Sequence, residues 1–208
     1  MKVLFYGGAF NPVSKAHIEL ANYVRESLHF DKVIFMPTKD RYIKHDEGKD
    51  FVIKESNRFK LLEEVAKEND WMIVSDYELN CDKQPRTYET LCFLKNKGYD
   101  LKLLIGSDWL LKLNSGWKYV DEIMHEFGVI LMTRNHDDIK QIIEQDEYLR
   151  QFKEYITCVN TPDIYQNISS TKIRQALFSS NLNELELMIP KEIKLETFLD
   201  IVKGDTDD

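Results

Sequence analysis

Residues 3–17 read VLFYGGAFNPVSKAH, and this stretch decides the fold. It opens with the apolar run Val3–Tyr6, passes through Gly7 and Gly8, and leads into a helical pattern from Lys15. The pattern predicts a strand, a glycine turn and a helix. A turn of this kind directs backbone N–H groups and a helix dipole at an anion, and glycine lets the backbone come close to it. The stretch therefore predicts an anion-binding site.

A second segment, ISSTKIR at residues 168–174, has complementary chemistry. Ser169 and Ser170 are hydroxyl residues well suited to cap a helix, and Lys172 and Arg174 place two cations in its first turn. One glycine turn alone is weak support for a function. The two segments together predict a cradle for a triphosphate.

Beyond these segments, apolar runs alternate with helical patterns. We expect strands over residues 2–6, 32–37, 72–76, 101–106, 129–133 and 155–160. We expect helices over residues 15–28, 54–68, 87–97, 119–126, 137–152, 170–178, 182–188 and 191–202. Several strands are apolar almost throughout, which is typical of strands covered on both faces. The alternation predicts an α/β fold: a doubly wound, mostly parallel, Rossmann-like sheet with helices on both faces and a small C-terminal helical region.

Length and composition narrow the class of protein. With 208 residues and 43% hydrophobic content, we expect a single domain over residues 1–203 and a disordered acidic tail over 204–208. A net charge of −8 argues against a nucleic-acid binder but leaves room for small anionic substrates. Three cysteines without metal-ligand spacing favour a reducing compartment. No apolar run has the length of a membrane span or a signal-peptide core, so we expect a cytoplasmic protein. The oligomeric state stays open.

Three stretches follow expected strands: residues 7–17, 38–49 and 106–108. In a doubly wound sheet, ligands bind beyond the carboxyl ends of the strands. We therefore expect these stretches to contribute to one site.

Two motifs resemble the signatures of the nucleotidylyltransferase superfamily. The run GGAFNP at residues 7–12, followed by Ser14-x-Ala16-His17, resembles its phosphate-binding signature, and ISSTKIR matches its second signature. Within the superfamily, the chain most resembles the nicotinate/nicotinamide mononucleotide adenylyltransferases, over residues 2–190. The supporting segments are RTYETL at 86–91, IGSD at 105–108 with Trp117 downstream, and MTR at 132–134.

The resemblance implies transfer of AMP from ATP to the phosphate of nicotinate mononucleotide, or of nicotinamide mononucleotide, with release of pyrophosphate. The product would be deamido-NAD or NAD, in NAD biosynthesis. The segments around Thr87 and Trp117 favour nicotinate. Mg²⁺ is the expected cofactor, bound through the ATP phosphates and without protein ligands. The implied partners are these small molecules, and neither a nucleic acid nor a membrane.

The resemblance also assigns roles to individual residues. It implies a catalytic set of Ser14, His17, Lys44 and Arg174. It implies an ATP-binding set of Gly7, Gly8, Ala9, Phe10, Ser14, His17, Gly106, Asp108, Ile168, Ser169, Ser170 and Arg174. It implies an acceptor-binding set of Asn11, Lys44, Thr87, Trp117 and Arg134. Some of these residues also have a purely structural interpretation, as residues at a helix start (Ser14, Thr87, Asp108), a core aromatic (Trp117) or a surface lysine (Lys44).

The first signature departs from the superfamily at Ser14, where histidine or threonine is usual, and at Ala16, where glycine is usual. A hydroxyl at Ser14 can still bond a phosphate oxygen, whereas the Ala16 methyl group can obstruct close approach of ATP. Two alternatives therefore stay open. One is another superfamily enzyme, such as a phosphopantetheine adenylyltransferase or a cytidylyltransferase, and the other is a nucleotide-binding module with weakened catalysis.

Overall fold

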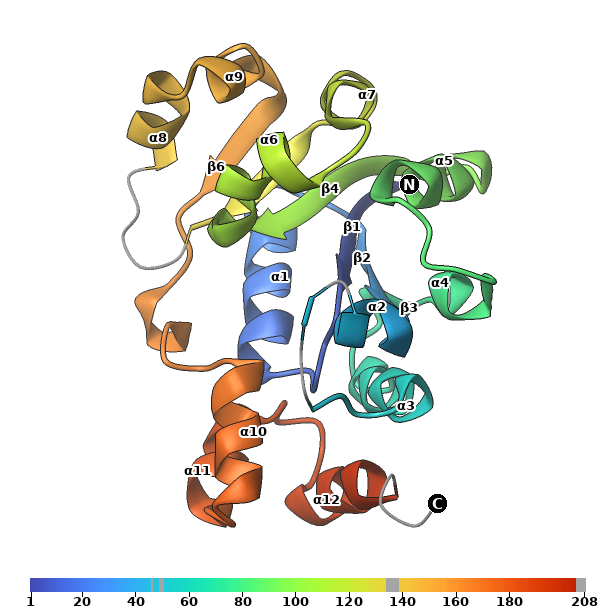
Figure 1. Ribbon diagram of the computed structural model, residues 1–208. Coiled ribbons are helices and arrows are strands. Elements are labelled where there is room, and N and C mark those ends of the chain that lie inside the picture. The colour runs from blue at the N-terminus through green and yellow to red at the C-terminus, as the bar shows by residue number, and fades with distance from the viewer. Residues whose placement is uncertain (46, 49–50, 134–138, 205–208) are drawn as a thin grey trace. The chain divides into compact units, whose positions relative to one another are not determined.

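The computed structural model describes residues 1–45, 47–48, 51–133 and 139–204 (Figure 1). Its six strands form one sheet in the order β3-β2-β1-β4-β5-β6. The strands are β1 (Lys2–Gly8), β2 (Lys32–Pro37), β3 (Met72–Val74), β4 (Asp100–Gly106), β5 (Val129–Met132) and β6 (Ile156–Val159). This is the strand order of a doubly wound sheet, with its switch point between β1 and β4. The predicted fold class is confirmed.

The register of the sheet follows its apolar runs. In the parallel pair β1–β4, Val3 lies opposite Leu101 and Phe5 opposite Leu103. The parallel pair β4–β5 aligns Gly106 with Met132. Pairing of β5 with β6 is also parallel. All four residues of β5 are buried, because helices cover parallel sheets on both faces and leave no solvated side.

The chain divides into two compact units. The first unit comprises Met1–Tyr6, Leu20–Val33 and Arg86–Gln166. It includes β4, β5 and β6 and the helices α5 (Thr87–Asn96), α6 (Leu113–Gly116), α7 (Val120–Glu126), α8 (Ile139–Gln145) and α9 (Glu147–Arg150), with short 3₁₀ segments at Ser107–Lys112, Lys153–Tyr155 and Asp163–Tyr165. Helix α5 packs on β4 in this unit.

The second unit comprises Gly7–Glu19, Ile34–Pro85 and Asn167–Asp208. It includes β3 and the helices α2 (Asp40–His45), α3 (Glu55–Ala66), α4 (Tyr77–Asn80), α10 (Ser170–Phe178), α11 (Leu182–Met188) and α12 (Leu195–Lys203). Within it, α10 packs against α11, and α3 packs against β3 and α12. Helix α1 (Lys15–Ser27) begins in the second unit and continues into the first.

The expected helix over 137–152 is wrong as a single element, because the structure has α8 and α9 in its place. Asp146 is extended, and its carboxylate accepts a hydrogen bond from the Leu149 N–H at 2.9 Å, which caps α9. The expected loop after β2 contains α2. The last helix begins at Leu195, later than expected, after an extended Lys194. Of the expected tail, residues 205–208 lie outside the described residues.

No helix in the described part of the chain combines the length and apolar character needed to cross a membrane.

Candidate active site

The loop between β1 and α1 is held closely against the protein. Phe10 adopts a left-handed backbone with φ of 43°, and its side chain is buried. A Cβ atom at Gly8 would lie 3.4 Å from the Phe10 ring, so this ring covers Gly8. The same ring meets His17 edge-on, with ring centroids 5.3 Å apart. Two residues of the predicted ATP-binding set, Phe10 and His17, are thereby in contact.

Ser14 and His17 cap the start of α1 reciprocally. The Ser14 oxygens accept from the His17 N–H, at 3.0 Å for the carbonyl and 3.4 Å for Oγ. In return, His17 Nδ1 accepts from the Ser14 N–H at 3.0 Å and lies 2.7 Å from Ser14 Oγ. This is a capping box with histidine in the place of glutamate. The cap expected of Ser14 is therefore present.

The reciprocal cap also fixes the proton of His17. A backbone N–H can only donate, so Nδ1 must present its lone pair to Ser14. In the neutral imidazole the proton then lies on Nε2. The side chain of Ser14 is fully buried, which places this arrangement away from competing solvent.

Helix α10 is bonded to the same loop. Ser169 caps it by accepting from the Lys172 N–H at 3.3 Å. Ser170 Oγ donates to the Pro12 carbonyl at 2.8 Å, and Arg174 Nη1 donates to the Asn11 carbonyl at 2.7 Å. The structure thus brings together the two segments that the sequence predicts to form one cradle. Ile168 lies directly before the Ser169 cap and is half-buried.

The Arg174 guanidinium keeps donors for a ligand beyond these contacts. It makes one bond to Asn11 and one, at 3.2 Å, to Thr171 Oγ1, among five N–H groups. Burial lowers the pKa of Arg174 from its ordinary value. A guanidinium stays charged through such a shift, so the side chain is a permanent cation beside the loop.

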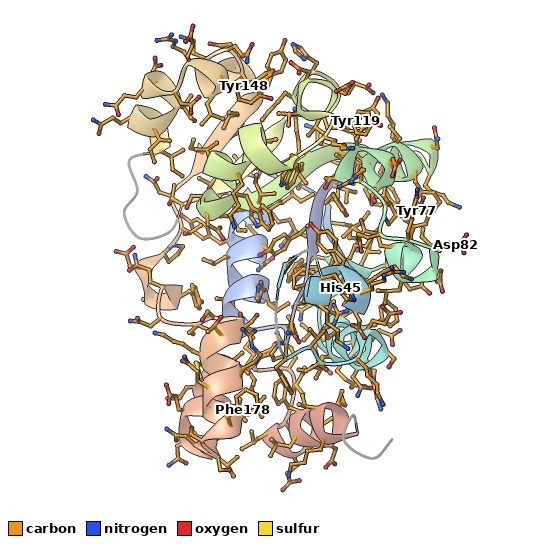
Figure 2. All side chains as sticks on the ribbon, viewed as in Figure 1. His45, Tyr77, Asp82, Tyr119, Tyr148 and Phe178 are labelled. Atoms are coloured by element: carbon orange, nitrogen blue, oxygen red, sulfur yellow. The ribbon has the colours of Figure 1, made fainter. Side chains whose placement is uncertain are left out.

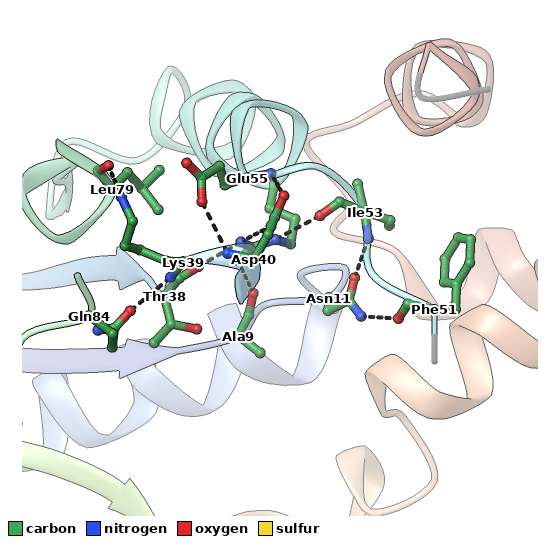
Figure 3. A network of polar contacts seen from close by, with 11 residues as sticks. Ala9, Asn11, Thr38, Lys39, Asp40, Phe51, Ile53, Glu55, Leu79 and Gln84 are labelled. Carbon is green, nitrogen blue, oxygen red and sulfur yellow. Dashed lines mark hydrogen bonds and ion pairs between the residues drawn. The ribbon is translucent and has the colours of Figure 1, made fainter. Parts of the chain in front are cut away.

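Asn11 uses its side chain to hold the backbone of residues 51–53. Its Nδ2 donates to the Phe51 carbonyl at 2.8 Å, and its Oδ1 accepts from the Ile53 N–H at 2.9 Å. Figure 3 shows Asn11 lying between these two backbone groups. Asn11 is buried, and its carboxamide therefore serves the loop; its predicted acceptor-binding role stays a prediction.

Arg58 of α3 is a fully buried cation, whereas the sequence left it open as a support for the loop around residues 38–45 or a plain surface charge. It donates to the backbone carbonyls of Ala9, Thr38 and Ile53 and pairs with Asp40. Burial lowers its pKa, an effect that the bond to Asp40 opposes. The sequence carries no local signal for this role, because a single arginine on a helix resembles a surface residue.

Helix α2 is fixed to α3 by a reciprocal pair of bonds. The Asp40 N–H donates to Glu55 Oε2 and the Glu55 N–H to Asp40 Oδ2, each at 3.0 Å (Figure 3). The last turn of α2 carries Lys44 and His45, both exposed (Figure 2). Lys44 thus lies on an anchored helix with its ammonium group in solvent, a placement that suits both phosphate binding and a plain surface lysine.

The remaining predicted residues belong to the first unit. A Cβ atom at Gly106 would lie 2.5 Å from Asp108 Oδ1, so a larger residue at this position would require the exposed Asp108 carboxylate to shift. Trp117 is half-buried and meets Trp109 edge-on at 5.9 Å. Thr87 is the first residue of α5, directly after the Arg86 cap. Arg134 lies outside the described residues.

The donors around the first loop suit an anion better than a metal ion. They are a histidine, a guanidinium, hydroxyl groups and helix N-termini. Within residues 1–45, 47–48, 51–133 and 139–204, no three or more His, Cys, Asp and Glu side chains are grouped so that they could hold a metal ion.

Comparison with known proteins now decides the family. Residues 5–176 match the cytidylyltransferase-like family, which covers both predicted signatures. The chain belongs to this family. Cytidylyltransferase-like relatives include a protein of Clostridium acetobutylicum, named a probable nicotinate-nucleotide adenylyltransferase. It is 32% identical over 179 residues, which are 85% of this chain and 86% of the relative. A relative of the same name from Fusobacterium nucleatum is 31% identical over 93% of this chain and 95% of its own.

A solved structure has the same cytidylyltransferase-like fold. It is the nicotinic acid mononucleotide adenylyltransferase of Plasmodium falciparum, complexed with NaAD. The TM-score is 0.74 with 19% sequence identity, over 99% of this chain and 96% of that one. At this identity the likeness concerns the fold alone.

Ala16, one of the two departures from the family signature, is packed inside the protein. It is 1% exposed, so protein atoms cover its methyl group. The other departure, Ser14, keeps a polar contact with His17. Neither residue therefore gives a structural reason to expect weakened catalysis.

Proposed function

We propose that this protein is a nicotinate-nucleotide adenylyltransferase, which transfers AMP from ATP to nicotinate mononucleotide and releases pyrophosphate. One observation carries the proposal: the start of α1, with its Ser14–His17 cap, and the start of α10, with Ser170 and Arg174, are bonded to one short loop. This arrangement provides two helix N-termini and a cation for one polyanion. The family membership and the names of the relatives support the same activity.

In the proposed reaction, the acceptor phosphate attacks the α-phosphorus of ATP. A new P–O bond forms to the acceptor oxygen, the bond to the bridging oxygen of the β-phosphate breaks, and pyrophosphate carries the electron pair away. The nucleophile is already an anion, so the site needs no base and no covalent intermediate. Catalysis then rests on alignment of the two reactants and on stabilisation of the charge that grows on the phosphates.

His17 would supply that stabilisation as a hydrogen-bond donor. Its Nδ1 accepts from Ser14, so in the neutral imidazole the group that donates to a phosphate oxygen would be Nε2–H. Such a bond strengthens as negative charge accumulates in the transition state, and therefore raises kcat. Arg174 would hold the leaving phosphates through its planar fork, which fits phosphate oxygens better than an ammonium group does.

Mg²⁺ enters the proposal as part of the nucleotide. When bound, it neutralises phosphate charge. Its ligands would be phosphate oxygens, since the loop offers hydrogen-bond donors and a metal ion needs lone pairs. Gly7, Gly8 and Ala9 would leave room for the triphosphate, and Asp108 would accept bonds from the ribose hydroxyls. Thr87, Trp117, Lys44 and Arg134 are proposed for the acceptor.

The test is pyrophosphate release from ATP and Mg²⁺ with three acceptors: nicotinate mononucleotide, nicotinamide mononucleotide and phosphopantetheine. The proposal expects fastest release with nicotinate mononucleotide, and deamido-NAD as the product. Faster release with phosphopantetheine would assign another superfamily activity. ATP binding without release for any acceptor would identify a nucleotide-binding module instead.

A further inference from the structure

A single buried side chain connects three loops of the second unit. Arg58 has no solvent-exposed surface, and each of its three nitrogens donates a hydrogen bond. Nε donates to the Ile53 carbonyl at 2.9 Å and Nη1 to the Ala9 carbonyl at 2.5 Å. Nη2 donates both to the Thr38 carbonyl at 2.6 Å and to Asp40 Oδ1 at 2.7 Å.

These partners come from three segments of the second unit, two of which contain predicted ligand-binding residues. Ala9 belongs to the glycine turn, Thr38 follows β2, and Ile53 precedes α3. Asp40 begins α2, the helix that carries Lys44. We propose that Arg58 is a positioning residue, which sets the geometry of the ATP loop and of α2 together; this inference rests on the proposed function of the same site.

Peptide geometry explains how Arg58 acts on the turn. A trans peptide directs its C=O and its N–H in opposite directions. At Thr38, the carbonyl points to Arg58 while the N–H of the same peptide, that of Lys39, donates to Gln84 Oε1 at 2.8 Å. At Ala9, the bond from Arg58 likewise turns the next N–H, that of Phe10, away from the cation. Arg58 therefore fixes which face of the glycine turn presents donors.

The bond to Asp40 extends the effect to α2. Asp40 uses Oδ1 for Arg58 and Oδ2 for the Glu55 N–H, so one carboxylate joins α2 to two points of α3. A lysine cannot replace this arrangement, because an ammonium group is a point donor without the planar fork that reaches four acceptors. The negative charge of Asp40 is also needed, since a buried guanidinium that loses its carboxylate partner is strongly unfavourable.

The inference is tested with Arg58→Lys, Arg58→Ala and Asp40→Asn, with Arg25→Lys in α1, a half-buried arginine outside the predicted site, as the matched control. We measure kcat, KM for both substrates, ATP affinity and thermal unfolding on the full chain. Arg58→Lys is expected to lower kcat/KM by roughly 10- to 100-fold, because small misplacement of reactants has effects of that size. The control is expected to keep wild-type kinetics.

Two readouts separate positioning from a general loss of stability. Methylguanidinium, added below denaturing concentrations, should restore activity to Arg58→Ala, because it refills the vacated space with the same donors. Hydrogen exchange should speed up in Arg58→Lys at residues 9–17 and 38–45, but not in α7 of the first unit. If Arg58→Ala does not fold, Arg58→Lys and Asp40→Asn decide the question by these measurements.

The outcomes are distinguishable from failure of the proposed function. Wild-type protein that releases no pyrophosphate would overturn the proposed function, while ATP affinity and hydrogen exchange would still test Arg58. A folded Arg58→Lys variant with wild-type kcat, KM and exchange rates would overturn the positioning role, whatever the activity of the wild type.

Discussion

Ser14 and His17 bond each other reciprocally at the first turn of α1. The Ser14 N–H donates to His17 Nδ1, and the His17 N–H donates to the Ser14 carbonyl. The cap that begins the helix is therefore also the contact that orients the imidazole. Ser14 departs from the usual family signature, but it still orients the imidazole, since its hydroxyl lies 2.7 Å from Nδ1.

Replacement of His17 should distinguish the roles of its two imidazole nitrogens. A glutamine amide reaches the position of Nε2, whereas an asparagine amide reaches only that of Nδ1. We expect His17→Ala and His17→Asn to lower kcat by roughly 10²- to 10³-fold, as for the loss of one transition-state donor, with His17→Gln less affected. ATP affinity should change little. Steady-state kinetics and equilibrium ATP binding measure the two effects; equal kcat in all variants would remove His17 from the mechanism.

Loss of the Ser14 hydroxyl should have a smaller effect, because the backbone N–H still holds Nδ1. Ser14→Ala is expected to reduce the free energy of unfolding by about 1 kcal/mol, the usual effect of losing a helix cap. Its kcat should fall by less than that of His17→Ala. Ser14→Thr keeps the hydroxyl and should restore both quantities. Chemical denaturation and initial rates check this, and a Ser14→Ala variant less active than His17→Ala would contradict it.

The guanidinium of Arg174 should matter through its shape. Arg174→Lys keeps the charge but loses the fork that bonds Asn11 and Thr171. We expect the KM for ATP to rise by about tenfold, as for loss of one charge-assisted hydrogen bond. Lys172→Ala is the matched control in the same turn, since its ammonium group bonds only Asn167 among the contacts that we describe. A KM that rises in Lys172→Ala but not in Arg174→Lys would assign the binding of ATP to positive charge in this turn and not to the guanidinium fork.

At Thr38 we expect a substitution to stabilise the protein. Among the described residues, its Oγ1 is the buried side-chain polar atom without a hydrogen-bond partner. Thr38→Val removes the hydroxyl at nearly constant shape, so the free energy of unfolding should rise by about 1 kcal/mol. Urea denaturation of ligand-free protein measures the change. A loss of stability would show that the hydroxyl has a partner in solution.

The pair Tyr88–Glu126 in the first unit should be visible as a pH effect. The Tyr88 hydroxyl donates to Glu126 Oε1 at 2.5 Å, which raises the pKa of Tyr88; the same bond, with help from Lys95, lowers the pKa of Glu126. The lowered carboxyl pKa stabilises the fold above about pH 4.3, and the raised phenol pKa stabilises it below about pH 10. Tyr88→Phe should lower Tm most between these limits, and the effect should fade as the pH falls through the pKa of Glu126 in the folded protein or rises through that of Tyr88.

NMR titration of the Glu126 carboxyl provides the direct check. Its pKa should move back toward the ordinary value in Tyr88→Phe, and by less in Lys95→Met, since the tyrosine bond is the larger cause. An unchanged titration in Tyr88→Phe would exclude the bond.

The sequence predicts well what local patterns determine. The apolar runs locate all six strands, and α10 and α11 have the expected bounds, because caps and apolar faces are local signals. Helix α2 has no such pattern in DRYIKH, and it is held through its first residue, Asp40, by Glu55 and Arg58 of α3. The break at Asp146 did have a local signal, a capping carboxylate three residues before Leu149.

The candidate site likewise has a part that the sequence could predict and a part that it could not. Both signatures could be found in the sequence, because glycine and hydroxyl patterns are specific to phosphate cradles. The contacts of Ser170 with Pro12 and of Arg174 with Asn11 could not, because they depend on packing of distant segments. The role of Arg58 stayed undecided between loop support and surface charge, since its burial results from three separate loops.

The bonds between α10 and the first loop join residues 158 and 163 positions apart. During synthesis, the glycine turn leaves the ribosome long before its partners exist. A nascent chain, or a fragment that stops before Asn167, has the turn without Ser170 and Arg174. These contacts can form only after residues 170–174 have been made, so a shorter nascent chain has the glycine turn in an unclosed form.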